Sequence, residues 1–226
     1  MTGTKGEILA LLKRNGGHSV GELAAALRLA PITVRQHLTR LQRDALVVRE
    51  LAGRPQGRSF YVFRLTAKAH AAAFPRRSDR LAELLVREIG LLEAGDIEGR
   101  SARDKVSVVL QRLADRLADD FAPLVRDWQL EERVAFVTEV MHADGGFAEW
   151  GAVEQGYEIR DFNCLFARLF QDGTRSEVCE WHRTFLTRML GAEVRVSPCP
   201  DAGRCCRFIV ESDQRARATP LTARVV

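Results

Sequence analysis

The fold of the first third of the chain is decided by residues 19–44, which read SVGELAAALRLAPITVRQHLTRLQRD. Ser19, followed three residues later by Glu22, has the capping-box form, which predicts that a helix starts there. Pro31 suits the first turn of a second helix, because its missing N–H would have no helical partner there anyway. Three apolar residues of that second helix recur at helical spacing and are predicted to pack inward, namely Val34, Leu38 and Leu41.

The residues on either side of this stretch complete a small domain. An apolar set at helical spacing predicts a helix over residues 6–14, which Asn15-Gly16-Gly17 ends. After the second helix, residues 46–51 and 59–65 alternate enough to predict a β-hairpin with a basic tip. Three helices followed by a hairpin is the plan of a winged helix-turn-helix, which we predict for residues 1–75.

The charge of the chain is divided unevenly. Residues 1–77 carry 14 Lys and Arg against 4 Asp and Glu, whereas the remaining residues carry 20 against 26. A basic N-terminal third favours contact with the phosphates of double-stranded DNA. In a helix-turn-helix the second helix enters the major groove, where Arg pairs with guanine and Gln with adenine. The residues predicted to contact DNA are Thr33, Arg35, Gln36, Thr39, Arg40 and Arg43 on this helix, with Arg54 and Arg58 at the hairpin tip.

The rest of the chain predicts a second, mixed part. Helical patterns cover residues 80–92, 104–121, 130–141 and 179–190, and strand-like patterns cover 147–153, 157–163, 194–196 and 206–210. We therefore predict an α+β protein: the winged helix-turn-helix, then a mostly helical dimerisation region and an α+β sensor domain over residues 76–210, and a flexible tail at 211–226. A helix-turn-helix normally works as a dimer. The apolar stripe Leu81, Leu85, Ile89 and Leu92 is equally suited to a homodimer seam and to the core of one chain.

All five cysteines fall within residues 164–206, at Cys164, Cys179, Cys199, Cys205 and Cys206. The chain opens without the apolar segment of a secretory signal and has no stretch long enough to cross a membrane, so we expect a cytoplasmic protein without membrane partners. In that reducing compartment, clustered thiols bind metal or do redox chemistry more often than they form structural disulfides. No C-x-x-C pair is present, which excludes a zinc ribbon or a ferredoxin-type run by spacing.

Several of these motifs occur together in a known family of regulators. The chain carries SVGELAAAL at 19–27, TVRQHL at 33–38, GGF at 145–147, and cysteines in the settings Asn163-Cys164, Val178-Cys179 and Cys206-Arg-Phe208. In these it resembles the Suf operon repressor (SufR) family of ArsR/DeoR-type winged-helix regulators. The resemblance implies a homodimeric repressor that binds operator DNA and controls iron–sulfur assembly (suf) genes. It also implies that Cys164, Cys179 and Cys206 hold an iron–sulfur cluster, either [4Fe–4S] or [2Fe–2S], whose loss relieves repression.

The residues leave the rest of this site open. The fourth ligand is Cys199, Cys205, His182 or a non-protein group, with Cys199 preferred because adjacent cysteines diverge in a strand. A helix starting at Cys179 would favour its thiolate through the helix dipole, and His182, three residues later, makes a zinc site an alternative to the cluster.

Two further alternatives involve no metal. The thiols could be buried and inert, and the chain could be a repressor that responds to a small apolar ligand. An enzyme with a small-molecule substrate is not expected, because no Gly-rich phosphate loop and no H-E-x-x-H pair are present.

Overall fold

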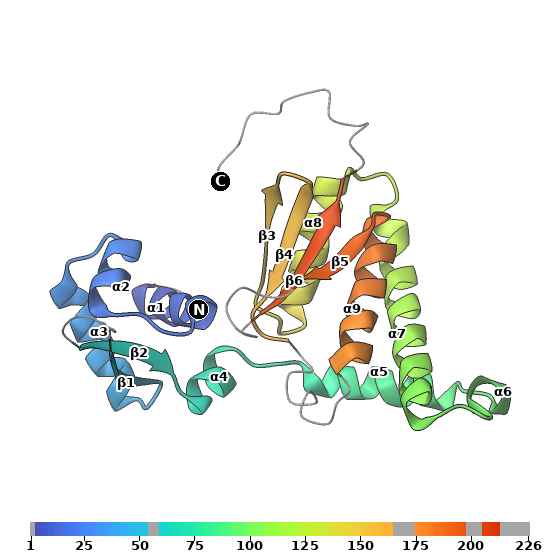
Figure 1. Cartoon of the computed structure of the whole chain (residues 1–226), viewed down its shortest axis with the longest axis horizontal. Coiled ribbons are helices and arrows are strands. Elements are labelled where there is room, and N and C mark those ends of the chain that lie inside the picture. Colours follow the sequence, from blue (N-terminus) through green and yellow to red (C-terminus); the bar gives the residue numbers. More distant parts are fainter. Residues whose placement is uncertain (1–2, 54–58, 165–174, 198–204, 213–226) are drawn as a thin grey trace.

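The computed structural model describes residues 3–53, 59–164, 175–197 and 205–212, and it shows an α+β protein in which a small N-terminal part lies beside a larger C-terminal part (Figure 1). The N-terminal part is a winged helix-turn-helix. Its elements are α1 (Thr4–Asn15), α2 (Val20–Leu27), α3 (Pro31–Arg43), β1 (Val47–Ala52) and β2 (Phe60–Leu65). The two strands pair antiparallel from Val47 opposite Leu65 to Ala52 opposite Phe60. Each of these elements was predicted from the sequence, whereas the helix that follows them, α4 (Ala67–Ala73), was not.

The hydrophobic core of this part forms where the three helices meet the hairpin. The predicted inward residues of α3 are confirmed, since Val34, Leu38 and Leu41 are all buried. They pack with Ile8 and Leu12 of α1 and with further apolar residues of the other elements. Burial of the apolar side of α3 fixes which side of that helix stays in contact with water.

The C-terminal part consists of a four-stranded antiparallel sheet and the helices that pack on it. Its elements are α5 (Ser78–Gly90), α6 (Ala94–Ile97), α7 (Ala102–Val125), α8 (Leu130–Ala143), β3 (Ala148–Val153), β4 (Gly156–Asp161), α9 (Arg175–Leu190), β5 (Val194–Ser197) and β6 (Cys206–Glu211). The strand order is β3-β4-β6-β5. Helices α8 and α9 contact the sheet, and α7 packs against α9. The edge strand β3 is the one nearest to the N-terminal part (Figure 1).

The apolar stripe over residues 81–92, predicted as either dimer seam or core, is only partly buried within the chain. Leu81 and Leu85 are partly buried against the C-terminal core. Towards the end of the helix, by contrast, Ile89 is 56% exposed and Val86 is 69% exposed. The first half of the stripe therefore belongs to the core of one chain, whereas Ile89 of the second half, together with Val86 beside the stripe, is exposed at the surface of α5.

Candidate DNA-reading surface and thiol site

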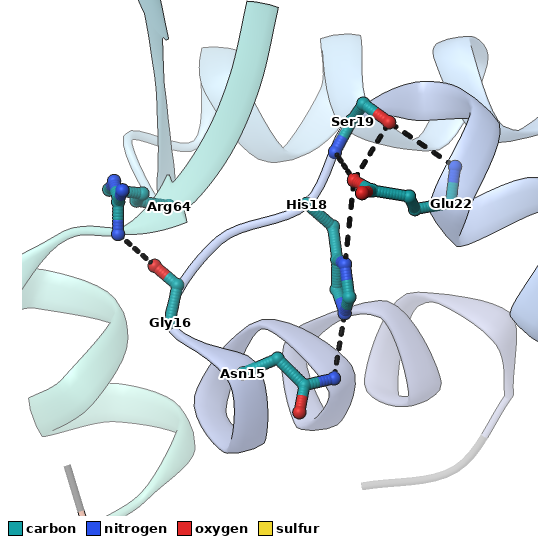
Figure 2. Close-up of polar contacts among 6 residues, drawn as sticks. All are labelled: Asn15, Gly16, His18, Ser19, Glu22 and Arg64. Carbon is teal, nitrogen blue, oxygen red and sulfur yellow. Dashed lines mark hydrogen bonds and ion pairs between the residues drawn. The ribbon is translucent and has the colours of Figure 1, made fainter. Parts of the chain in front are cut away.

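The turn that leads into α2 is held by polar contacts on both sides (Figure 2). The predicted capping box is confirmed: the Glu22 backbone N–H donates to Ser19 Oγ at 3.3 Å, and the Ser19 N–H donates to Glu22 Oε2 at 2.7 Å. The backbone N–H and the hydroxyl of Ser19 both donate to the Glu22 carboxylate, and these two hydrogen bonds hold its pKa below the usual value. Arg64 of β2 donates to the carbonyl of Gly16 at 2.5 Å, and His18 exchanges two backbone hydrogen bonds with Phe63. The hairpin is thereby fixed to the turn, which sets the position of the helices relative to the hairpin.

The outer side of α3 carries the residues predicted to read DNA. Five of them are exposed and lie opposite the buried residues of the helix; we call this set the reading face, and it comprises Arg35, Gln36, Thr39, Arg40 and Arg43. Thr33 is only half-buried, near the start of the helix, where a helix-turn-helix approaches base edges. The reading face therefore offers guanidinium and amide groups of the kind that pair with purines in the major groove.

The hairpin adds a basic group that the sequence analysis did not select. The guanidinium carbon of Arg49, on β1, lies 4.2 Å from the centre of the Tyr61 ring on β2. Stacking on an aromatic ring holds such a cation in place while leaving its N–H groups available. The Arg–Tyr pair could have been found in the sequence, because an antiparallel hairpin places nearby positions of its two strands side by side. The predicted contacts of Arg54 and Arg58 lie outside the described residues.

The three cysteines expected to hold a cluster lie at one end of the C-terminal part. Cys164 follows the end of β4, and Cys206 begins β6, where it is paired with Asp161 of the antiparallel β4. Cys179 lies on α9, which starts at that same end of the sheet (Figure 1). All three are thiols, Cys164 buried and the others half-buried. The fold thus brings soft, thiolate-forming ligands from three separate elements to one end of the domain.

The described side chains at this end of the domain do not form an assembled metal site. Within the described ranges, no group of three or more His, Cys, Asp or Glu side chains could hold a metal ion. The chemistry of three thiols fits iron or zinc. Cys205 is disulfide-bonded and so has no thiolate to give, and Cys199 lies outside the described residues.

Two details of α9 bear on the predicted ligands. The helix begins at Arg175 and not at Cys179, so the prediction that the helix dipole favours the Cys179 thiolate is wrong. The dipole acts mainly within the first turn, which Cys179 lies beyond. His182 is buried, with its ring 5.3 Å from that of Phe208, and burial lowers the pKa of its imidazole. His182 is therefore held in the neutral form that metals bind, but inside the apolar core.

Comparison with known families matches the N-terminal part. A family model described as winged helix-turn-helix DNA-binding matches residues 1–47. The chain is a DNA-binding regulator. No curated protein and no solved structure matches it. None of the described helices is long and apolar enough to cross a membrane.

The DNA-binding domain is joined to the C-terminal domain by a set of contacts that we call the domain junction. It comprises the end of α1, the linker 74–77 between α4 and α5, the turn 144–147 after α8, and residues 161–164 after β4. Phe147 packs edge-on against Phe74, with their ring centres 5.2 Å apart, and the Arg14 guanidinium carbon lies 5.0 Å from the Phe147 ring centre. Arg14 also forms an ion pair with Glu149 of β3. The DNA-binding domain is therefore held against the edge of the sheet.

The polar residues of this junction were not predicted from the sequence to have a role. Lys13 is the clearest omission, since it follows Leu9 at helical spacing and is 7% exposed. A lysine on the apolar face of an amphipathic helix was the available indication, because lysine is rarely buried unless it has a partner. Its partners, His70 and Asn163, come from distant parts of the sequence.

Proposed function

We propose that this regulator is a repressor whose operator binding is controlled by an iron–sulfur cluster held by Cys164, Cys179 and Cys206, and that its targets are genes of iron–sulfur cluster assembly. The observation that carries the proposal is the gathering of three thiols at one end of a domain that is packed against a DNA-binding domain. The SufR-like order of the cysteines supports the choice of cluster and of target genes.

The donor set supports a cluster through its chemistry. Thiolates are the usual ligands of iron–sulfur clusters, and the three cysteines come from a strand end, a helix and a strand start. The disulfide-bonded state of Cys205 argues against its use as the fourth ligand. When bound, the cluster would supply a group that responds to iron supply and to oxidation. The three cysteines would connect the end of β4, α9 and the start of β6 through that group. Binding or loss of the cluster would then change the conformation at this end of the domain.

Repression requires two reading heads on one operator, so we propose a homodimer. One reading helix contacts only a few base pairs, and two-fold symmetric sites are read by two copies of the same domain. The exposed Val86 and Ile89 of α5 are the apolar residues we assign to the dimer contact. Sedimentation of the protein with and without operator DNA measures this state directly.

The cluster is tested by purifying the protein without oxygen, recording its visible spectrum and measuring iron and acid-labile sulfide. The expected result is absorption near about 400 nm, with matched iron and sulfide. Adjacent residues give a matched pair of variants: Cys206→Ser is expected to lose the absorption and weaken operator binding, whereas Cys205→Ser keeps both. Retained absorption and full DNA affinity in Cys206→Ser, and in the corresponding variants of Cys164 and Cys179, would overturn the ligand assignment. Stoichiometric zinc without iron would replace the cluster by the zinc alternative.

A second candidate, a repressor that responds to a small apolar ligand, is favoured by one observation. A cavity of about 570 Å³ lies at the domain junction, lined in part by Leu11 and Leu27 of the DNA-binding domain and by Phe74 and Phe147. Its volume lies within the range of small-molecule sites, which often occur between domains. A colourless, metal-free protein whose DNA affinity changes when an apolar compound binds would support this candidate. Such a result would exclude the cluster.

A further inference from the structure

The residue directly before Cys164 connects three parts of the molecule. Asn163 is 1% exposed. Its side-chain N–H groups donate to the carbonyl of Phe74 at 3.1 Å and to the carbonyl of Gly145 at 2.6 Å. Its side-chain oxygen accepts a hydrogen bond from the Lys13 ammonium at 3.0 Å. A single amide therefore bonds to α1, to the linker and to the turn after α8, and both its N–H donors and its oxygen are used.

Lys13 brings the DNA-binding domain into this arrangement. Its ammonium lies 3.1 Å from Nδ1 of His70, on α4, and 5.3 Å from the centre of the Phe74 ring. The carboxylate of Asp161 attracts it from the C-terminal domain, and Arg76 repels it from the linker. A buried ammonium needs partners in place of water, and Asn163 is the hydrogen-bonding partner that the C-terminal domain supplies.

The linker is fixed to the same place by its own contacts. Arg76 donates to the carbonyl of Cys164 at 2.9 Å, and the backbone N–H of Arg77 donates to the carbonyl of Asp144 at 3.2 Å. Gly145 has a positive φ of 90°, and a Cβ there would lie 2.6 Å from the carbonyl oxygen of Pro75. The backbone of the linker thus passes too close to this turn for any side chain at that position.

These contacts have a property that matters for regulation: they are satisfied only when the two domains are in this relative position. If the DNA-binding domain turned away, the Asn163 oxygen and the Lys13 ammonium would each lose a buried partner. Buried polar groups without partners are strongly unfavourable, so such a junction favours one arrangement over a continuous range of others. By contrast, the Arg14–Glu149 ion pair is about one-third exposed on both sides, so water can replace either partner.

We infer that Asn163 is the positioning residue through which changes at Cys164 set the orientation of the DNA-binding domain. Its neighbour in the chain is the proposed ligand, and Arg76 holds the Cys164 carbonyl from the linker side. A shift of the backbone at Cys164 moves the Asn163 amide away from Lys13 and from the linker. The nature of the trigger rests on the proposed function, whereas the connection between the domains does not.

The first test uses the full chain without any cluster, so that it does not depend on the proposed function. Hydrogen exchange of the backbone is compared between the wild type and Asn163→Ala. The expected result is faster exchange, by about tenfold or more, at the amides of Arg77 and Gly145, with unchanged exchange within α3. Lys13→Met removes the same contact from the other domain and is expected to give the same pattern. Glu149→Gln, which weakens the ion pair at the sheet edge, serves as the control and leaves the junction amides protected.

The second test measures how strongly cluster loading changes operator affinity. Asn163→Ala is expected to keep the visible absorption of the wild type, while the ratio of operator dissociation constants between cluster-free and loaded protein falls towards one. Couplings of this kind are typically about 5- to 150-fold in a wild-type regulator. Unchanged junction exchange in both Asn163→Ala and Lys13→Met would overturn the inference, and so would a wild-type ratio in a coloured Asn163→Ala protein. If the wild type holds no cluster, the proposed function fails, and the exchange experiment still decides the role of Asn163.

Discussion

Raising the pH is predicted to stabilise the folded chain through Lys13. Burial is the main cause that lowers the pKa of its ammonium from 10.5 to about 8, and the positive charge of Arg76 adds to this, while Asp161 opposes it. Below pH 8 both the folded and the unfolded chain carry the proton, so the folded state bears the full penalty of the buried charge. Between about pH 8 and 10.5 the unfolded chain binds more protons than the folded one, and the free energy of unfolding therefore rises with pH.

The size of the effect follows from the same pKa difference. A change from 10.5 to about 8 corresponds to about 3 kcal/mol of unfolding free energy, reached once the pH exceeds the unfolded value. That is a large share of the roughly 5–15 kcal/mol by which domains are stable.

Urea unfolding followed by far-ultraviolet circular dichroism, at several values between pH 7 and 10.5, measures the effect. Other lysines and tyrosines also titrate in this range, so the informative quantity is the difference between the wild type and Lys13→Met. That variant has no charge to bury, and its stability relative to the wild type is expected to fall by about 3 kcal/mol as the pH rises. Lys105→Met removes an exposed lysine of α7 and is the control, with no such trend. A constant difference between the wild type and Lys13→Met across the range would refute the reasoning.

Three further predictions concern single residues. Arg35→Ala is expected to weaken specific operator binding by about 1–3 kcal/mol, because it removes the base contact that we propose for Arg35; fluorescence anisotropy should show a much smaller loss for Lys105→Ala, which removes the same charge elsewhere. Gly145→Ala is expected to destabilise the junction by about 1–3 kcal/mol, because its backbone has a positive φ and its Cβ would meet the linker; an unchanged thermal midpoint would contradict this. Ser19→Ala is expected to lower the free energy of unfolding by about 1 kcal/mol through loss of the helix cap; denaturant unfolding measures it, and an equal loss in Ser101→Ala, at the cap of α7, would show that the effect belongs to caps in general.

The DNA-binding domain could be predicted in detail because its determinants are local. The capping box, the proline at the first turn of α3 and the helical spacing of Val34, Leu38 and Leu41 all act within a few residues. Helix α4 was missed because its seven residues are mostly alanine and show no apolar period. Its start was nevertheless marked, since the Thr66 hydroxyl accepts a hydrogen bond from the N–H of Ala69.

The C-terminal domain was predictable as elements but not as a site. Its strands and most of its helices follow from apolar spacing, but the short helix α6 was not predicted. The start of α9 was placed four residues too late, although Thr174 and Glu177 have the sequence spacing of a capping box just before and within its first turn. The junction lay beyond sequence reasoning for a different reason. Lys13 and Asn163 are 150 residues apart, and nothing in either local pattern indicates the other. Contacts of that kind depend on how two finished domains pack, which periodicity does not encode.

The pairing of Lys13 with Asn163 also constrains how this protein can change over evolutionary time. Replacing either residue alone leaves the other as a buried polar group without this hydrogen bond. Replacing both by apolar residues of similar size leaves no such unsatisfied group. Relatives that keep this arrangement of domains should therefore keep both residues or lose both, so that two positions 150 residues apart vary together. Lineages in which the pair has become apolar would retain a rigid molecule but lose the polar contact next to Cys164, and with it the route by which that end of the sheet could influence DNA binding.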